Sequence, residues 1–150
     1  MTLNIIPLPN LSAVEAMAMR LAPLLRRGDT LLLQGPLGAG KTSFARSLLQ
    51  ALGITEDVPS PTFTILQTYD AANFTIYHFD LYRLKNEAEL LELGWDDALA
   101  EGLCIVEWPE RAGSRLPKNY LILKFNLENG SHALAFDPKG EWVGRMKVLT

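Results

Sequence analysis

The chain has 150 residues, of which 48% are hydrophobic, and this length and composition predict a single globular domain spanning residues 1–150. A formal net charge of −3 at pH 7 argues against a protein that binds nucleic acid by itself through a basic face. The one cysteine, Cys104, excludes an internal disulfide and stands in an apolar run, where we expect a packed core residue. Residues 1–7 lack the features of a signal peptide and no apolar stretch has membrane-spanning length, so we expect a cytoplasmic protein that contacts neither membranes nor DNA.

The first predicted elements are an edge strand, a helix and a second strand. Residues 3–8 suit an edge strand that is ended by prolines. Residues 12–15 (SAVE) have the pattern of a capping box, and apolar residues then recur at helical spacing as far as Leu25. Gly28 suits the C-terminal cap of this helix. Residues 30–34 (TLLLQ) form a short apolar run, which is typical of a buried strand.

Residues 35–42 (GPLGAGKT) match G-x-x-x-x-G-K-S/T, the pattern of a phosphate-binding loop. The glycines let successive backbone N–H groups point inward, and the predicted helix that follows, ended by Gly53, would present its positive end to the same anion. Lys41 would reach the β- and γ-phosphates, and the Thr42 hydroxyl would ligate Mg²⁺. We expect the nucleotide to contact the whole loop and the next residue: Gly35, Pro36, Leu37, Gly38, Ala39, Gly40, Lys41, Thr42 and Ser43.

Two strands are predicted at residues 62–69 and 74–79, where they would form an antiparallel hairpin. The second strand ends on Asp80. Thr62 and Thr64 follow a rigid segment with two prolines, and a hydroxyl there could meet the γ-phosphate or the metal, as in the first switch loop of GTPases. The alternative is that both threonines only favour the strand.

The remaining residues predict short helices and further strands. The expected elements are a helix opened by a capping box at residues 86–89, a helical turn at 96–100, a strand at 103–107, a hairpin of strands at 120–127 and 132–136, and a loose helix or strand at 141–149. The fold class that follows is α/β. We expect a three-layer domain like those of P-loop NTPases, with a mixed sheet that has a parallel core and antiparallel hairpins.

Two acids, Asp80 and Glu107, stand at the ends of predicted strands. Ligands bind at the carboxyl ends of parallel strands, and Mg²⁺ prefers oxygen ligands and keeps several waters. One acid could therefore bind the metal together with Thr42, and the other could orient or deprotonate the attacking water. The sequence leaves open which acid does which. Our candidate catalytic residues are Lys41, Asp80 and Glu107, and our candidate metal ligands are Thr42, Glu107 and Asp80.

Neighbouring residues have less specific interpretations. His78 shares a strand face with Asp80 and could orient that acid, or be a buried core histidine. Trp108 could contact the nucleotide or a partner, or pack in the core. His132 falls on a hairpin surface and receives no role. A basic cluster after Glu107 could act on phosphates, contact tRNA or be solvated; its members are Arg111, Arg115 and Lys118.

Four segments closely resemble the TsaE (YjeE) family, small bacterial ATPases of the threonylcarbamoyladenosine tRNA-modification system. They are residues 35–42, 60–64 (SPTFT), 78–84 (HFDLYRL) and 106–110 (VEWPE). The segments at residues 78–84 and 106–110 are much more specific than the phosphate loop, which many families share. The loop of the family usually reads G-D-L-G-A-G-K-T, and Pro36 here replaces the acid and removes one backbone donor.

The resemblance implies an ATPase that acts with the TsaD–TsaB heterodimer, in which TsaD transfers the threonylcarbamoyl group to tRNA. This chain would then reach tRNA indirectly, through the complex. The resemblance also implies Mg²⁺ held by Thr42 and Glu107, and a need for Asp80 in hydrolysis. The sequence shows no obvious arginine finger, so we expect slow hydrolysis that a partner activates. The alternatives are a small-molecule or nucleoside kinase, and a non-enzymatic module whose shape is set by bound ATP.

Overall fold

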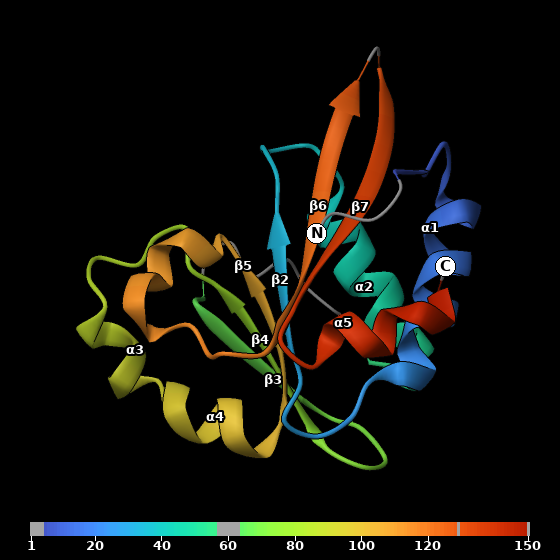
Figure 1. The fold of residues 1–150 in the computed structure, drawn as a ribbon. Coiled ribbons are helices and arrows are strands. Elements are labelled where there is room, and N and C mark those ends of the chain that lie inside the picture. Colours follow the sequence, from blue (N-terminus) through green and yellow to red (C-terminus); the bar gives the residue numbers. More distant parts are fainter. Residues whose placement is uncertain (1–4, 57–63, 129, 150) are drawn as a thin grey trace.

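The computed structural model describes residues 5–56, 64–128 and 130–149 of the chain. In these residues the strands form one seven-stranded mixed sheet, with the order β1-β7-β6-β2-β5-β4-β3 (Figure 1). The strands are β1 Ile6–Pro7, β2 Thr30–Gln34, β3 Leu66–Asp70, β4 Thr75–Asp80, β5 Leu103–Glu107, β6 Tyr120–Glu128 and β7 Ser131–Lys139. The α-helices are α1 Leu11–Leu21, α2 Lys41–Ala51, α3 Ala88–Glu92, α4 Trp95–Glu101 and α5 Trp142–Arg145. Short 3₁₀ segments are η1 Ala22–Leu24, η2 Pro109–Arg115 and η3 Met146–Leu149.

The centre of the sheet is parallel and its flanks are antiparallel. Strand β2 pairs in parallel with β5 and β6, and β4 pairs in parallel with β5. Strand β3 is antiparallel to β4, and β7 is antiparallel to β6 and β1. The predicted fold class, a mixed sheet with a parallel core and antiparallel hairpins, is confirmed. The parallel pairing also brings the carboxyl ends of β2, β4 and β5 to one edge of the sheet, where the phosphate loop begins.

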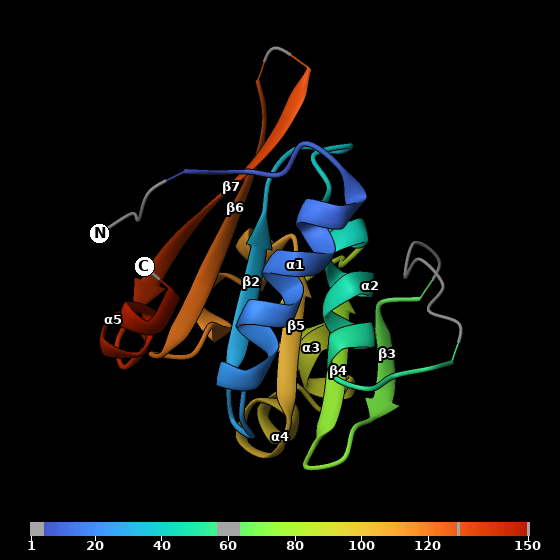
Figure 2. The same cartoon turned by 90° about the vertical axis from the view of Figure 1, so that its right-hand side faces the viewer.

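Helices cover both faces of this sheet, which gives the predicted three layers. Figure 2 shows α1 and α2 in front of the sheet, and α3 and α4 lie behind it. Alternate residues of the central strands pack into two cores, with Leu31 and Ile105 on the α1/α2 side and Leu32 and Cys104 on the α3/α4 side. The expectation that Cys104 is a core residue is confirmed, since it is fully buried and burial raises the pKa of its thiol to about 12.

The predicted start of the first helix is wrong. Helix α1 begins at Leu11, and its N-cap is Asn10, whose side chain accepts a hydrogen bond from the Ala13 N–H at 2.9 Å. Asn10 has the extended backbone that an N-cap requires, with φ −154° and ψ 173°. Ser12 therefore lies inside the first turn and does not cap it.

The predicted C-terminal cap at Gly28 is also wrong. Helix α1 ends at Leu21, and Pro23 lies in the 3₁₀ segment that follows, because proline lacks the N–H that an α-helix needs there. Gly28 instead forms a turn with φ +91°, and its N–H donates to the carbonyl of Gly102 at 2.8 Å. This hydrogen bond links the residues just before β2 to the residue just before β5.

The later elements keep the predicted order, with some changes in length. Strand β3 begins at Leu66, and residues 57–63 lie outside the described part of the chain. The C-terminal segment, left open between helix and strand, is helical as α5 and η3. None of the helices in the described ranges combines the length and hydropathy that a membrane span needs.

Candidate functional site: the phosphate loop and its acids

The loop at residues 35–42, named the phosphate loop after the sequence pattern that it matches, connects the end of β2 to the start of α2. Its three glycines all have positive φ, with Gly35 at +150°, Gly38 at +80° and Gly40 at +102°. A Cβ on Gly35 would lie 2.6 Å from the carbonyl oxygen of Phe125, so this position has no space for a side chain. Helix α2 has no side-chain cap at its N-cap, Gly40. Its first N–H groups are therefore not capped by a side chain, and this is the usual arrangement for binding an anion at a helix N-terminus.

Lys41 lies at the bottom of the site and is 5% exposed. Its ammonium donates a hydrogen bond to the Gly35 carbonyl at 2.6 Å and lies 3.7 Å from the centroid of the Trp108 ring. Burial lowers the pKa of Lys41, and the nearby carboxylates of Glu107 and Asp80 oppose this shift. The ammonium is thus partly desolvated and next to negative charge, in a place where phosphate oxygens would give it further partners.

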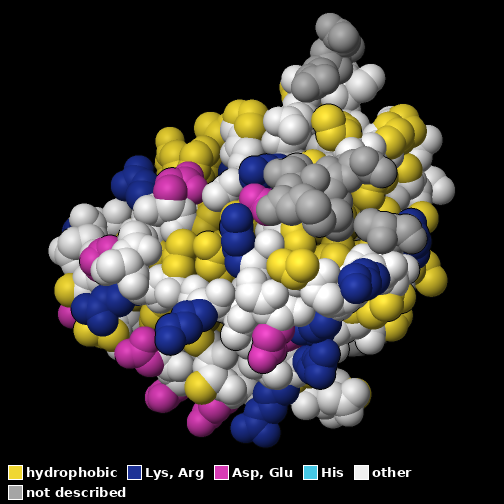
Figure 3. All heavy atoms as spheres, in the orientation of Figure 1, with side chains coloured by type: hydrophobic (Ala, Val, Ile, Leu, Met, Phe, Trp, Pro, Cys, Tyr) yellow, Lys and Arg dark blue, Asp and Glu magenta, His cyan; other side chains and the backbone are white. Residues whose placement is uncertain are grey.

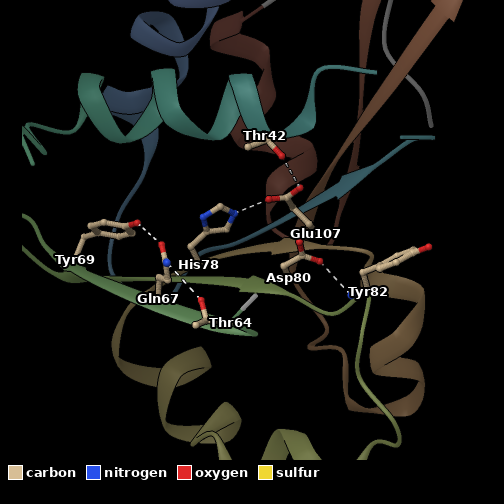
Figure 4. Close-up of polar contacts among 8 residues, drawn as sticks. All are labelled: Thr42, Thr64, Gln67, Tyr69, His78, Asp80, Tyr82 and Glu107. Carbon is tan, nitrogen blue, oxygen red and sulfur yellow. Dashed lines mark hydrogen bonds and ion pairs between the residues drawn. The ribbon is translucent and has the colours of Figure 1, made fainter. Parts of the chain in front are cut away.

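Three parts of the chain meet at Glu107, as Figure 4 shows. The Thr42 hydroxyl donates to Glu107 Oε1 at 3.3 Å, and His78 Nε2 lies 2.7 Å from Glu107 Oε2. Asp80 is directly opposite Glu107 in the parallel pairing of β4 and β5. The structure therefore brings together Thr42, Asp80 and Glu107, the three residues predicted from the sequence as metal ligands. Of the two interpretations of His78, the buried histidine is confirmed, since it is 1% exposed. The interpretation that it orients Asp80 is wrong, because its hydrogen-bond partner is Glu107 on the neighbouring strand.

The two acids have different surroundings. Glu107 is 2% exposed, whereas Asp80 is half-buried and its Oδ1 accepts a hydrogen bond from the Tyr82 N–H at 3.0 Å. Burial is the main cause of a raised pKa at Asp80, and the negative charge of Glu107 adds to it. The Tyr82 N–H, His78 and Lys41 act in the opposite direction. A carboxylate with a raised pKa is a better proton acceptor than one in water.

A cavity of about 570 Å³ opens over these residues. Its lining includes residues that were candidates from the sequence, namely Leu37, Gly38, Gly40, Lys41, Thr42, Ser43, Thr64, Asp80, Glu107 and Trp108. The other lining residues are Arg46, Ile65, Tyr82 and Arg83. Gly35, Pro36 and Ala39 belong to the loop but are not among the lining residues, and Ala39 packs in the core. Of the two threonine candidates, Thr64 lines the cavity, and Thr62 lies outside the described residues.

The arginines of the cavity are not the ones that the sequence suggested. Arg46 and Arg83 line it, whereas the arginines that the sequence suggested for a contact with phosphates were Arg111 and Arg115. Arg46 is four residues after Thr42 and hence on the same face of α2, a spacing that could have identified it. The basic cluster after Glu107 is exposed and lies outside the lining; its members are Arg111, Arg115 and Lys118. On the face in Figure 3, basic side chains lie among acidic ones, and the described residues form no continuous basic surface there.

Trp108 and His132 make contacts that no sequence pattern indicated. Trp108 is the only non-glycine residue in the described ranges with positive φ, at 58°, and its ring also packs on Tyr82 with centroids 5.1 Å apart. His132, which received no role, lies on β7 with Nε2 3.1 Å from the carbonyl oxygen of Gly38 in the phosphate loop. Both contacts depend on how distant segments pack together.

Comparison with known proteins agrees with this architecture. The family model described as "Threonylcarbamoyl adenosine biosynthesis protein TsaE" matches residues 8–134. The tRNA threonylcarbamoyladenosine biosynthesis protein TsaE of Rickettsia conorii is 50% identical over 97 residues, which are 64% of this chain and 55% of that protein. The protein of the same name from Bacillus subtilis is 41% identical over 113 residues, which are 75% of this chain and 70% of that protein.

A solved structure shares the fold. The crystal structure of Bacillus subtilis YdiB superposes with a TM-score of 0.81 at 29% identity, and the match covers 99% of this chain and 92% of that one. The chain matches less than two thirds of the length of two Rickettsia relatives, 55% for R. conorii and 61% for R. felis. The family model covers most of the chain, and the resemblance found in the sequence is confirmed. The chain belongs to the TsaE family.

Proposed function

We propose that this chain binds ATP and hydrolyses it to ADP and phosphate, as an accessory step in the threonylcarbamoyladenosine modification of tRNA. The observation that carries the proposal is a single cavity lined by the loop before α2 and by the side chains of Lys41, Asp80 and Glu107. The first N–H groups of α2 have no side-chain cap. The name of the matched family supplies the pathway. The choice of ATP follows the resemblance, since the chain has no N-K-x-D guanine motif.

The donor set at the site suits Mg²⁺. Thr42 and Glu107 offer hydroxyl and carboxylate oxygens 3.3 Å apart, and Asp80 lies alongside on the next strand. No group of three or more His, Cys, Asp or Glu residues in the described ranges could hold a metal by itself. Mg²⁺ normally needs few protein ligands, because it keeps waters and binds phosphate oxygens. We assign Thr42 and Glu107 to the metal, which when bound would neutralise charge on the phosphates.

The side chains then have distinct tasks. The first N–H groups of α2 and the ammonium of Lys41 hold the phosphates and stabilise the charge that develops on the γ-phosphoryl group. Asp80 orients a water molecule and accepts its proton as the water oxygen bonds to phosphorus and the bond to the β-phosphate oxygen breaks. Asp80 suits this task better than Glu107, because both Glu107 oxygens already have partners in the structure.

The proposed partners are TsaD and TsaB, with tRNA contacted through their complex. Support comes from the family resemblance and from the match to the TsaE family model. Arg46 and Arg83 line the cavity, so this chain can place arginines near the phosphates, and a partner could increase the rate by ordering them.

Reconstituted tRNA modification tests the proposal. Purified TsaD and TsaB would be supplied with tRNA and the activated threonylcarbamoyl donor, with and without this chain and ATP. We expect repeated modification only when both the chain and ATP are present, and we expect a chain with Lys41→Met not to support it. Equal modification without this chain or without ATP would contradict the proposal.

The kinase alternative is separated by the fate of the γ-phosphate. With γ-labelled ATP and a panel of nucleosides and small acceptors, hydrolysis releases all label as inorganic phosphate. Label found on an acceptor would favour the kinase.

A further inference from the structure

A buried polar contact joins His78 to Glu107 at the site. His78 is 1% exposed and Glu107 is 2% exposed, and their Nε2 and Oε2 atoms lie 2.7 Å apart. The two residues lie on the adjacent parallel strands β4 and β5. His78 is opposite Ile105, which is two residues before Glu107 and shares its face of the sheet. Both side chains therefore lie on the α2 face of the sheet, as Figure 4 shows.

The two oxygens of Glu107 have separate partners. Oε2 is next to His78, and Oε1 is next to the Thr42 hydroxyl. A carboxylate can rotate about its last bond, so a short hydrogen bond at one oxygen fixes the plane of the group and the direction of the other oxygen. A carboxylate this deeply buried also needs a donor, because an unpaired charge in the interior is costly.

The remaining nitrogen of His78 indicates which proton the ring carries. Nδ1 is buried and has no hydrogen-bond partner in the described part of the chain. A proton on Nδ1 would leave a buried donor unpaired, whereas a proton on Nε2 is donated to Glu107. The hydrogen-bond pattern thus assigns Nε2–H as the donor and the carboxylate as the acceptor.

We propose that His78 is a positioning residue for the Mg²⁺ ligand Glu107. By donating to Oε2 it holds the carboxylate so that Oε1 faces Thr42, and it touches neither the nucleotide nor the metal. The inference rests on the proposed function, because it needs Mg²⁺ to bind between Thr42 and Glu107. It predicts that loss of the histidine reduces the gain in nucleotide affinity that Mg²⁺ provides. The metal-independent binding of the phosphates by the loop should not change.

The test is a fluorescence titration of the purified chain with an N-methylanthraniloyl derivative of a non-hydrolysable ATP analogue, in Mg²⁺ and in EDTA. The dissociation constant in EDTA divided by the dissociation constant in Mg²⁺ measures how much Mg²⁺ strengthens binding. We expect His78→Leu to reduce this ratio by about 10- to 100-fold, the usual effect of losing a residue that orients a metal ligand. Affinity in EDTA should stay at the wild-type value.

Two further variants separate positioning from structure. His78→Gln can place an amide N–H near the position of Nε2 and should restore the Mg²⁺ effect, whereas His78→Asn is too short and should not. If the leucine variant does not fold, as judged by circular dichroism, the Gln and Asn variants decide the question. The inference is overturned if the ratio is the same in wild type and in His78→Leu, if His78→Leu loses affinity equally in Mg²⁺ and EDTA, or if Gln and Asn behave alike.

Failure of the proposed function looks different in the same titration. If the wild-type chain does not bind the analogue at all, nucleotide binding itself is wrong. If it binds equally well with and without Mg²⁺, the metal site is wrong and the inference about His78 fails with it. The positioning role alone is contradicted when the wild-type chain shows the Mg²⁺ effect and the variants give one of the three overturning results above.

Discussion

Replacing Lys41 with methionine should weaken binding of ATP analogues by about 10- to 150-fold, the range expected when a charged hydrogen-bond donor is lost. Methionine keeps an unbranched stem under the Trp108 ring, where the ammonium now lies 3.7 Å from the ring centroid. It removes the charge, the hydrogen bond to the Gly35 carbonyl and the donor that would reach the phosphates. Isothermal titration calorimetry with a non-hydrolysable analogue and Mg²⁺ measures the effect.

The fold should survive this change. Burial lowers the pKa of Lys41, which means that the site disfavours its charged form when no anion is bound. We therefore expect the thermal midpoint of Lys41→Met to be no lower than that of the wild type. Lys118→Met is the matched control, because Lys118 is exposed and lies outside the cavity. This variant should bind the ATP analogue with wild-type affinity. Wild-type affinity in Lys41→Met would show that the phosphates bind elsewhere.

Replacing Asp80 with asparagine should lower the rate of ATP hydrolysis by about 10²- to 10⁴-fold, the contribution of a positioned general base. Asparagine has the same shape and can still accept the hydrogen bond from the Tyr82 N–H through its carbonyl oxygen. It cannot take a proton from water. Single-turnover hydrolysis with the chain in excess over ATP measures the chemical step, and nucleotide affinity should stay at the wild-type value.

The control is Asp97→Asn, on the exposed side of α4, which should hydrolyse ATP at the wild-type rate. An Asp80→Asn variant with undiminished hydrolysis would remove Asp80 from the mechanism. The same variant also tests the alternative of a non-enzymatic module whose shape is set by bound ATP. If hydrolysis is lost but reconstituted tRNA modification continues at the wild-type rate, bound ATP acts only by setting the shape of the chain.

Local sequence patterns were enough to predict the centre of the site. The loop at residues 35–42 requires its own glycines and a helix directly after it, and both the pattern and the helix are contiguous in the chain. Glu107 could be found because four apolar residues before it predict a buried strand that ends at the acid. The same reasoning placed Asp80 at the end of β4.

Other contacts could not be predicted because they depend on strand order and packing. His78 contacts Glu107 only because β4 lies beside β5, and the sequence does not state which strands are neighbours. His132 reaches the phosphate loop through the hairpin of β6 and β7. The start of α1 was misassigned because Asn10 and Ser12 are both good N-cap residues, and a local pattern cannot choose between them.

We expect the phosphates of ATP to lie in the loop at residues 35–42, with Mg²⁺ held by Thr42 and Glu107. A crystal structure of this chain grown with a non-hydrolysable ATP analogue and Mg²⁺ is the decisive test of this arrangement. We expect electron density for the phosphates against the first N–H groups of α2 and Lys41, and a metal ion that contacts both Thr42 and Glu107. Nucleotide bound elsewhere, or a metal that contacts neither residue, would contradict it.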